Sequence, residues 1–503
     1  MFIIFILPFY LKEHKGIKCQ IKRTILLTNV IIYDNIYRIE VIMMPNNSII
    51  SKRQEIVAKL TQARLEKGLS QAQLAKLVGT QRSNICRIEN GGQNLSLDLL
   101  IKITDALGKN VSVLLEEKSV EMSNVYNLKL YDDVLVTFSL EEKGLEGLVA
   151  EIKSFDEGKK HLLPINMALT AKGMIKWLSN RVIPKNRAFV DEILKTFGLS
   201  VNDTKGIIDV CLGLSLNDSY WVTPVEFAGK FADYNLFENP FSEALSLVAY
   251  TGVGSAEKAF STSPEFTTNG MLRKAWRHIE NDGIYLYKGG TEGAANAGNE
   301  PYSEYYACQI AKAMGLNFVE YDLENWKGIL ASKCCLFTDI DTSFVPVSRL
   351  IKDRTLKNAL DYYKELGKDF YDDLCSMLVF DAVIYNEDRH FGNFGVLRDN
   401  HTGNIIKPAP IFDNGLSLFN YAMADDLENL SEYAKTRTPP YGVSFDDVCK
   451  AVMSSRQKTQ LRRLLNFTFT RHPSINLPEE RLTAIEAQIK KRARELMSIP
   501  NSR

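Results

Sequence analysis

The sequence of 503 residues lacks several patterns that mark specialised protein classes. No stretch approaches the roughly 20 uninterrupted apolar residues that a membrane-spanning helix requires. The apolar start Met1–Leu11 is interrupted by Pro8 and has no small-residue cleavage site behind it. The eight cysteines form no C-x-x-C pair, which argues against a zinc site or a redox dithiol. We therefore predict free thiols in a cytoplasmic protein that has no membrane partner.

A net charge is also lacking, because 61 Lys and Arg residues balance 61 Asp and Glu residues. With 45% hydrophobic and 24% charged residues, the composition is that of a globular protein, which excludes a disordered or uniformly basic chain. At roughly 100 to 200 residues per domain, the length predicts two to four domains. A balanced total can conceal a small basic domain, so the charge has to be counted by segment.

We predict four segments and no long Gly-, Pro- or Ser-rich linker between them. Residues 1–50 resemble no clear module; a genuine extension or translation from a start site upstream of Met43 or Met44 would account for them. The remaining segments are a helical domain at 51–118, a first subdomain at 119–250 and a large core at 251–503 that ends in a helical lobe. The boundary after the helical domain is expected near Glu117 to Asn124.

Short helices begin after Ser51, where apolar residues recur at steps of three and four. Ser70 stands at the N-cap position of a helix over 71–78, and Gly79 ends that helix. Thr80 is expected to cap the next helix, which has the sequence QRSNICRIE and directs Ile85 and Ile88 inward. This pattern predicts two helices joined by a tight turn.

The second of these helices has an N-terminal half rich in amides and arginine. In the major groove of DNA, Gln and Asn bond adenine, and Arg bonds guanine or a phosphate. From Ser51 to Lys118 there are 11 Lys or Arg and 7 Asp or Glu, a net charge of +4 that suits backbone phosphates. A small helical bundle used for protein contacts remains the alternative.

The string LTQARLEKGLSQAQLAKLVGTQRSNICRIENGG, continuing to LSLDLLIKITDALGKNV, resembles the Cro/C1 (XRE)-type helix-turn-helix family. The resemblance implies an all-α domain whose partner is a double-stranded DNA operator. It also implies a homodimer, because repressors of this type read paired half-sites. The DNA-binding residues are then the candidate base readers Gln81, Arg82 and Asn84, the backbone contact Gln71, and Arg87.

The most informative segment of the core is a polar loop, NEDRHFGNFG, that follows the apolar helical run SMLVFDAVI. A strand, a turn at 401–404 and a second strand ending in IFDNG come next. Phosphoryl transfer needs a carboxylate to orient the attacking hydroxyl and oxygen ligands to hold magnesium. Asp388, Asn393 and Asp413 have the spacing of the protein-kinase catalytic loop and metal-binding Asp. Since Asp and Asn also crowd ordinary loops, a structural role for any single residue stays open.

A kinase also needs a cation for the nucleotide phosphates, usually a strand Lys held by a helix Glu. Residues 283–290 read as a short strand with Lys288 near its end, and the helix that begins near Pro301 carries Glu304 on its first turns. We expect Glu304 to turn inward to Lys288. A solvated strand end is the alternative for Lys288.

Two further segments of the core are expected to contact a nucleotide. The turn from Phe266 to Trp276 contains Gly270 and is followed by Lys274, and its backbone N–H groups are candidates for covering phosphates, although a G-x-G-x-x-G loop is absent. The strand at 333–337, KCCLF, is the expected hinge that holds adenine. Its cysteines, Cys334 and Cys335, are expected in the strand core.

Together NEDRHFGNFG, IFDNG, TTNGMLRK, the Lys288 strand and SEYYACQIAKAMGL resemble HipA-type serine/threonine kinases, the toxin halves of HipBA toxin-antitoxin systems. The resemblance covers 267–418 well and implies a bilobal kinase-like fold that uses ATP and Mg²⁺ on a protein Ser or Thr substrate. It also implies the following roles: Asp388 as catalytic base, Lys288 with its partner Glu304 on the phosphates, Gly270 and Lys274 on the nucleotide, and Asn393 and Asp413 as magnesium ligands.

In that family the antitoxin is a separate Cro-type protein, whereas here such a domain precedes the kinase-like part in one chain. The family's loop that is autophosphorylated on a serine corresponds to 267–274, where Thr267 and Thr268 stand instead, so self-inactivation by that route is doubtful. His390 is expected either to position the loop or to be merely structural. Residues 163–219 are expected to form an extra subdomain without assigned chemistry.

The fold class expected for the chain is therefore α+β and multidomain, an all-α helix-turn-helix domain followed by a bilobal kinase-like fold. The terminal stretch 461–503 reads as helical, and its charge run KKRARE is expected on a solvated helix face. Two other functions stay open. One is a repressor whose kinase-like part is an inactive sensor, and the other is a kinase that acts on a small molecule.

Overall fold

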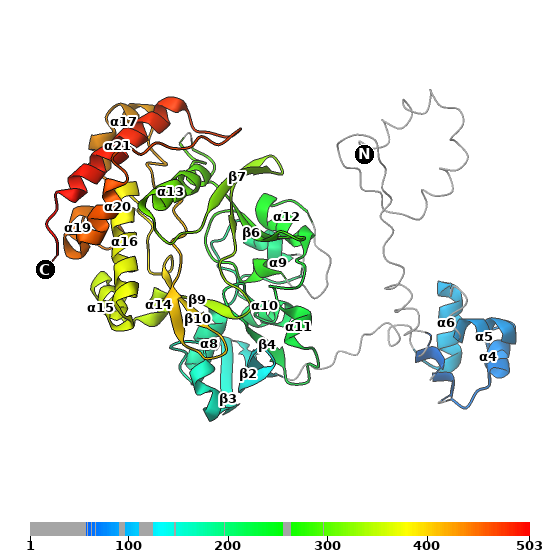
Figure 1. Cartoon of the computed structure of the whole chain (residues 1–503). Helices are drawn as coiled ribbons and strands as arrows, with labels where there is room; N and C mark the ends of the chain where they lie inside the picture. Colours follow the sequence, from blue (N-terminus) through cyan, green and yellow to red (C-terminus); the bar gives the residue numbers. More distant parts are fainter. Residues whose placement is uncertain are drawn as a thin grey trace, which may run out of the picture. The chain divides into compact units, whose positions relative to one another are not determined.

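The computed structural model describes residues 57–109, apart from 58, 62, 66 and 90–95, and residues 124–502, apart from 145–146, 196, 255–262 and 295. The expected extension at 1–50 and the ends of the helical domain lie outside the described residues. The chain divides into two compact units, Met1–Glu121 and Met122–Arg503 (Figure 1). Each unit is described by itself.

The small unit packs short helices around one apolar core. Its elements include α4 (Gln71–Leu77), α5 (Arg82–Glu89) and α6 (Leu97–Leu107). Ser70 caps α4 as expected, because its side chain accepts a hydrogen bond from the Gln73 N–H. Thr80 does not cap α5: its Oγ1 accepts from Asn84 Nδ2, and Gln81 precedes the helix. The core contains Leu74, Ile85, Ile88 and Ile103.

The large unit begins with an antiparallel sheet in the order β3-β2-β1-β4. Its strands are β1 (Val125–Leu130), β2 (Asp133–Lys143), β3 (Gly147–Phe155) and β4 (Tyr220–Pro224). Between β3 and β4 the chain forms three helices, α8 (Ala171–Ser179), α9 (Val190–Lys195) and α10 (Thr204–Cys211). The extra subdomain expected at 163–219 thus supplies helices to this first sheet, and α8 packs against β3.

A second antiparallel sheet follows, in the order β5-β6-β8-β7. Its strands are β5 (Lys274–Ile279), β6 (Gly283–Gly289), β7 (Tyr321–Trp326) and β8 (Ile329–Cys335), and the helices around it are α11 (Phe231–Tyr234), α12 (Glu243–Thr251) and α13 (Glu300–Met314). Cys334 is buried, but Cys335 is exposed because successive side chains of a strand point to opposite faces. The expectation that both lie in the core is therefore wrong for Cys335.

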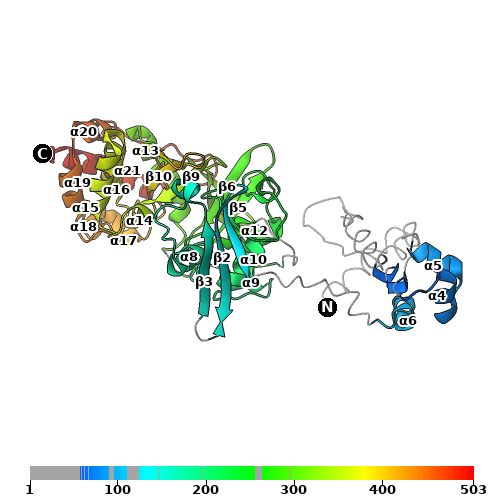
Figure 2. The same cartoon turned by 90° about the horizontal axis from the view of Figure 1, so that it is seen from below.

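The rest of the large unit is a helical lobe around a small three-stranded sheet, β11-β10-β9. The strands are β9 (Thr342–Pro346), β10 (Gly395–Asp399) and β11 (Ile405–Pro408); the helices are α14 (Val347–Leu350), α15 (Leu356–Leu366), α16 (Lys368–Ile384), α17 (Ala424–Glu428), α18 (Leu430–Lys435), α19 (Phe445–Val452), α20 (Ser455–Arg462) and α21 (Glu479–Met497). In both views these helices lie on one side of the unit and the two larger sheets on the other (Figures 1 and 2).

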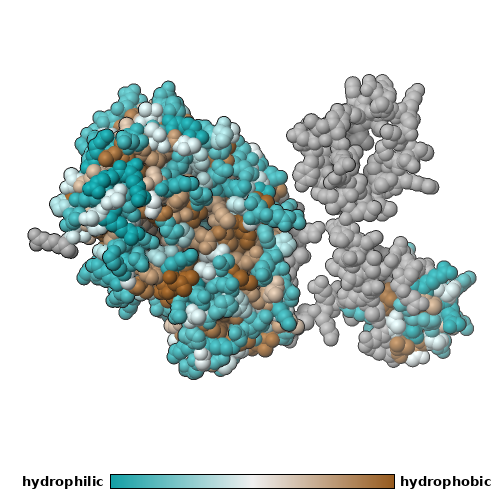
Figure 3. Space-filling view, viewed as in Figure 1, coloured by the Kyte–Doolittle hydropathy of each residue, from teal (hydrophilic) through white to brown (hydrophobic). Residues whose placement is uncertain are grey.

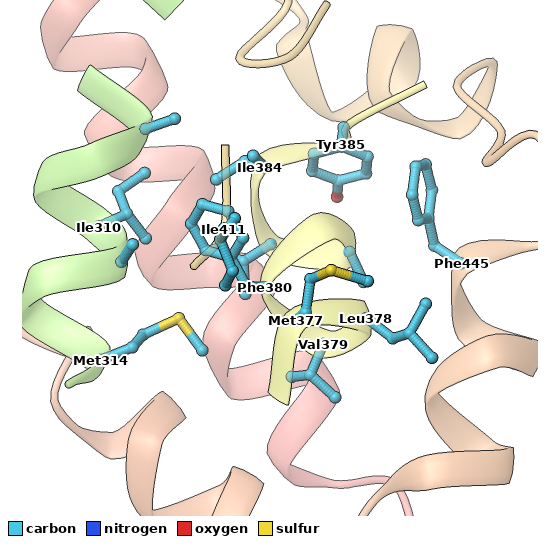
Figure 4. Packing of buried hydrophobic residues seen from close by; sticks show 14 of the residues in the cluster. Ile310, Met314, Met377, Leu378, Val379, Phe380, Ile384, Tyr385, Ile411 and Phe445 are labelled. Atoms are coloured by element: carbon cyan, nitrogen blue, oxygen red, sulfur yellow. The ribbon is translucent and has the colours of Figure 1, made fainter. Parts of the chain in front are cut away.

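Helix α16 is the centre of the helical lobe. Its residues from Leu374 to Ile384 are all buried. Figure 4 shows Phe380 and Ile384 of α16 beside Ile310 of α13, and these residues belong to one apolar cluster. Burial of a large aliphatic or aromatic side chain stabilises the fold by roughly 1.5–3 kcal/mol. This packing fixes the position of α13 relative to the end of α16.

Two details of the helical lobe differ from expectation. The segment IFDNG is not a strand, since β11 ends at Pro408 and Ile411 makes only an isolated bridge with Phe318. The run KKRARE is not wholly solvated, because Arg492 is buried and its Nε donates to the Ala382 carbonyl oxygen.

The α+β multidomain fold class is confirmed, with a helical small unit and a large unit made of sheets and a helical lobe. Within the described residues, no helix is both long enough and apolar enough to span a membrane. In the large unit the described cysteines, Cys211, Cys308, Cys334, Cys335, Cys375 and Cys449, are free thiols. In Figure 3 hydrophobic residues gather in the middle of one face of the large unit, and hydrophilic residues surround them.

Candidate functional site

Strand β6 and helix α13 bring Lys288 and Glu304 together. Lys288 Nζ lies 3.0 Å from Glu304 Oε1 and also donates to the Asp413 carboxylate. The Lys288 and Glu304 side chains are 12% and 1% exposed, so solvent screens this ion pair little. Burial alone would lower the pKa of Lys288, but the charges of Asp413 and Glu304 raise it above its ordinary value. The site therefore contains a permanently charged ammonium group.

Glu304 also fixes the segment that contains Asp413. Its second oxygen, Oε2, accepts a hydrogen bond of 2.7 Å from the Asn414 N–H. Asp413 has a left-handed φ of +56°, and its N–H donates to the Tyr321 hydroxyl at 3.1 Å. Burial raises the pKa of Asp413, but Lys288 and Lys274 outweigh burial and hold that pKa below its usual range. Asp413 is therefore an ionised carboxylate on a constrained turn.

The loop after α16 carries Asp388 and Asn393. Asp388 is half-buried, and its pKa is raised by burial first and by the nearby charge of Asp413 second. The Asn393 side chain is buried, and its Nδ2 donates to the Asp388 carbonyl oxygen at 3.0 Å. This bond orients the amide. Its carbonyl oxygen, Oδ1, is then the atom of Asn393 that could bind a cation. The structure thus places Asp388, Asn393 and Asp413 in one region.

The oxygen donors of this region fit a divalent cation. Magnesium prefers carboxylate and carbonyl oxygens and usually takes only one or two protein ligands beside phosphates and water. Asp413 supplies a carboxylate, and the Oδ1 of Asn393 accepts no hydrogen bond from any residue that the structure describes. In the same part of the chain no group of three or more His, Cys, Asp or Glu side chains forms a metal site.

Arg389 organises the loop, and the sequence prediction missed it. Its fully buried guanidinium donates to the Asp381 carboxylate, to the Asn393 carbonyl oxygen at 3.0 Å and to Asn414 Oδ1 at 2.5 Å. It also donates to the carbonyl oxygen of Phe412. One side chain thus joins α16, the Asp388 loop and the Asp413 turn. The signal in the sequence was Asp381, an acidic residue inside an apolar helix, which requires a buried partner.

The turn before β5 places a second lysine beside Lys288. Lys274 and Lys288 are directly paired across β5 and β6. Lys274 is buried, its Nζ donates to the Asn269 carbonyl oxygen at 2.9 Å, and burial and the charge of Lys288 lower its pKa to about 7. Gly270 has a φ of +94°, and a Cβ there would lie 2.2 Å from Lys274 Nζ. Both predicted nucleotide residues therefore adjoin the Lys288 site.

The other residues singled out near this site have local partners. Thr267 Oγ1 donates to the Leu214 carbonyl oxygen at 2.8 Å, and Thr268 Oγ1 donates to that of Pro264 at 2.7 Å. The exposed His390 accepts from the Gly392 N–H through Nδ1, a bond inside its own loop. The expected hinge at 333–337 spans the end of β8 and leads toward β9. Its role in holding adenine stays a prediction.

In the small unit, the candidate base readers lie on α5 and, in the case of Gln81, directly before it. Gln81, Arg82 and Arg87 are exposed, whereas Asn84 is half-buried and bonded to Thr80. Gln71 donates to Glu89 Oε2 at 2.8 Å. Exposed polar and cationic groups on one short helix are available to a ligand. The bonds of Gln71 and Asn84 each use one amide N–H, so the amide oxygens and the second N–H groups can still contact a ligand.

A buried ion pair that the sequence prediction missed fixes the end of α5 to Arg64, which lies in the helical segment before α4. Arg64 Nε lies 2.6 Å from Glu89 Oε1, and both side chains are under 10% exposed. Burial raises the pKa of Glu89, but the bonds from Arg64 and Gln71 lower it below its usual value. The carboxylate is therefore ionised and holds the C-terminal end of α5.

Known proteins are similar in sequence to the small unit and to part of the large unit. Residues 60–114 match the family model described as Helix-turn-helix. An uncharacterized HTH-type transcriptional regulator of Haemophilus influenzae is 38% identical over 61 residues, 12% of this chain and 62% of that protein. The serine/threonine-protein kinase CtkA of Helicobacter pylori is 30% identical over 178 residues, 31% of this chain and 53% of that kinase. The chain thus spans between half and two thirds of the length of these relatives.

Two solved structures align with parts of this chain at low sequence identity. The crystal structure of the Helicobacter pylori proinflammatory kinase CtkA aligns with 46% of this chain and 91% of its own, with 19% identity and a TM-score of 0.36. The Shewanella oneidensis MR-1 toxin-antitoxin complex of HipA, HipB and operator DNA contributes a chain that aligns over 75% of this chain and 100% of its own, with 11% identity and a TM-score of 0.45. The chain therefore joins a helix-turn-helix domain to a larger part that is similar in sequence to the serine/threonine-protein kinase CtkA.

Proposed function

We propose that the large unit is an ATP-dependent, magnesium-dependent protein serine/threonine kinase and that the small unit binds an operator DNA as part of a toxin-antitoxin type regulator. The observation that carries the kinase proposal is the position of Lys288, which is ion-paired with Glu304 and Asp413 in a buried site beside Asp388. Phosphoryl transfer depends mainly on positioned charges of this kind.

In the proposed reaction, the substrate hydroxyl oxygen attacks the γ-phosphorus, the bond to the ADP oxygen breaks, and the hydroxyl proton passes to Asp388. A raised pKa makes Asp388 a better proton acceptor near neutral pH than an ordinary aspartate. Lys288 and Lys274 offer positive charge to the phosphates. Asn393 and Asp413 would hold Mg²⁺, which neutralises charge on the transferred phosphoryl group.

The test is incubation of the purified chain with γ-labelled ATP and Mg²⁺, with and without a cell lysate. Asp388→Gln and Asp413→Ala are expected to abolish labelling of any protein, while Asp353→Asn, a change at an exposed residue, leaves it at the parent rate. All variants should bind the same DNA as the parent. If both site variants label a substrate at the parent rate, the assignment of these residues is wrong.

The same assay separates the alternatives. A parent protein that neither binds nor turns over Mg-ATP is a repressor with an inactive sensor. Label that appears only in small molecules indicates a small-molecule kinase.

We also propose that the protein acts as a homodimer in the cytoplasm, because operators read by helix-turn-helix repressors consist of paired half-sites. Native mass spectrometry with and without DNA tests the dimer.

A further inference from the structure

The segment between α8 and α9 contributes a buried cation to the turn before β5. Arg187 lies in the extra subdomain at 163–219, and its side chain is fully buried. Its Nη1 donates to the Glu265 carbonyl oxygen at 2.7 Å and to that of Thr268 at 3.4 Å. Its Nη2 donates to the Lys274 carbonyl oxygen at 2.9 Å and to the Glu265 carboxylate. One guanidinium thus bonds the start, the middle and the end of the turn.

Neighbouring contacts complete this attachment. Glu265 is fully buried, and its second oxygen accepts from the Trp276 N–H at 2.8 Å, so the carboxylate bridges Arg187 and β5. The Ala188 N–H donates to the Met271 carbonyl oxygen at 2.8 Å, which holds the tip of the turn. The shape of the turn therefore depends on residues that lie about eighty positions earlier in the chain.

Arginine is required for this arrangement for geometric reasons. A guanidinium presents five N–H donors in a rigid planar fork, whereas a lysine has one compact ammonium on a flexible stem. A lysine at 187 would keep the charge near Glu265 but could not reach the carbonyl oxygens of Thr268 and Lys274 at the same time. Arg187→Lys therefore removes contacts to the turn while it keeps the positive charge.

We propose that Arg187 is a positioning residue for the nucleotide: it fixes the turn at 267–274 and, through the Lys274 backbone, sets that lysine beside Lys288 to receive phosphates. This inference rests on the proposed kinase function. Arg187 itself is buried behind the turn and bonds only protein groups in the described residues. The extra subdomain, which the sequence left without a role, thereby acts on the phosphate-binding part of the site.

The test compares Arg187→Lys with Arg181→Lys in the full chain. Arg181 belongs to the same subdomain, is equally buried and pairs with Asp218 at 2.8 Å, but it bonds the carbonyl oxygens of Gly213 and Tyr220 and not the turn. Arg187→Lys is expected to raise the KM for ATP about 10-fold to 100-fold, with a smaller change in kcat at saturating ATP. Arg181→Lys should leave the KM for ATP unchanged, even if it lowers the Tm as much as Arg187→Lys does.

Hydrogen exchange gives a readout that needs no turnover. Amides of peptides that cover 266–276 are expected to exchange faster in Arg187→Lys and at the parent rate in Arg181→Lys. Parent-like exchange and KM in Arg187→Lys, or equal changes in both variants, would overturn the proposal. Should Arg187→Lys fail to fold, Glu265→Gln removes the bridging charge at constant volume and must show the same pattern. If the parent protein binds Mg-ATP but transfers no phosphate, the proposed kinase function is wrong. Amide hydrogen exchange and the Kd for Mg-ATP of the two arginine variants would still test the role of Arg187.

Discussion

Arg389 and Asp381 form a buried ion pair, with Arg389 Nε 3.0 Å from Asp381 Oδ2 and both side chains under 5% exposed. Asp381→Asn would leave the guanidinium buried without its counter-charge, which costs about 3–5 kcal/mol in comparable pairs. We expect a clearly lower urea midpoint for the large unit. All four tryptophans lie in this unit, so tryptophan fluorescence follows its unfolding alone.

The control for this prediction is Arg456→Gln, which breaks the ion pair between Arg456 and Asp373, where the side chains are 47% and 34% exposed. Pairs of this kind contribute about 0–1 kcal/mol. Its urea midpoint should stay close to that of the parent. Equal urea midpoints for Asp381→Asn and the parent would show that the buried Arg389 does not need the charge of Asp381 for the stability of the unit.

Gly270 and Gly328 both have left-handed backbones, but only Gly270 faces a functional group. A Cβ at Gly270 would lie 2.2 Å from Lys274 Nζ, whereas one at Gly328 meets nothing within 4 Å. Alanine in this conformation costs about 1–2 kcal/mol at either position. Gly270→Ala should in addition displace Lys274 and weaken Mg-ATP binding, while Gly328→Ala should lower the Tm only. Titration calorimetry with Mg-ATP measures the difference, and equal Kd values for the two variants contradict it.

The low pKa of Lys274 predicts proton uptake on nucleotide binding. With a pKa of about 7 caused by burial and the charge of Lys288, Lys274 is mostly neutral at pH 8. Phosphates placed beside it favour the charged form, so its pKa rises and the complex takes up a proton. Affinity for Mg-ATP should therefore increase as the pH falls from 8 through 7. Calorimetry at pH 8 in buffers of different ionisation enthalpy measures the uptake.

Lys274→Met is the variant that isolates this effect. It should remove the extra proton uptake, whereas Lys312→Met, at an exposed lysine, should keep it. Protonation of the nucleotide itself is common to all three proteins and cancels in the comparison. Unchanged uptake in Lys274→Met would assign the proton to another group.

The sequence predicted the elements of the site better than the contacts that hold them. The roles of Lys288, Glu304 and Asp413 could be proposed from their residue types and from an order along the chain that matches that of protein kinases. Which of Cys334 and Cys335 is buried depends on which face of β8 packs against the interior, and local sequence does not fix that face.

Buried arginines were the main omission. Arg64, Arg187 and Arg389 each bond residues from other elements, and their partners are separated from them by 25, 78 and 8 positions. In sequence such arginines look like ordinary surface cations, since arginine is rarely buried unless it is paired. Only Asp381, an acidic residue within an apolar helix, offered a local indication of one of these pairs.

Arg82 and Arg87 are exposed on α5 and are expected to contact DNA in the proposed regulator. A base contact by Arg82 predicts that Arg82→Ala weakens operator binding by about 1–3 kcal/mol and relaxes the sequence preference at one position. A phosphate contact by Arg87 predicts that Arg87→Ala weakens binding equally for all DNA sequences and lowers the salt slope by about one.

Lys102→Ala removes one exposed positive charge from α6 and is the matched control. Fluorescence anisotropy over a range of salt concentrations measures these effects. Because all three substitutions lower the net charge equally, losses of the same size in all three would mean that the unit attracts DNA only through its overall charge, and α5 would not be the recognition helix.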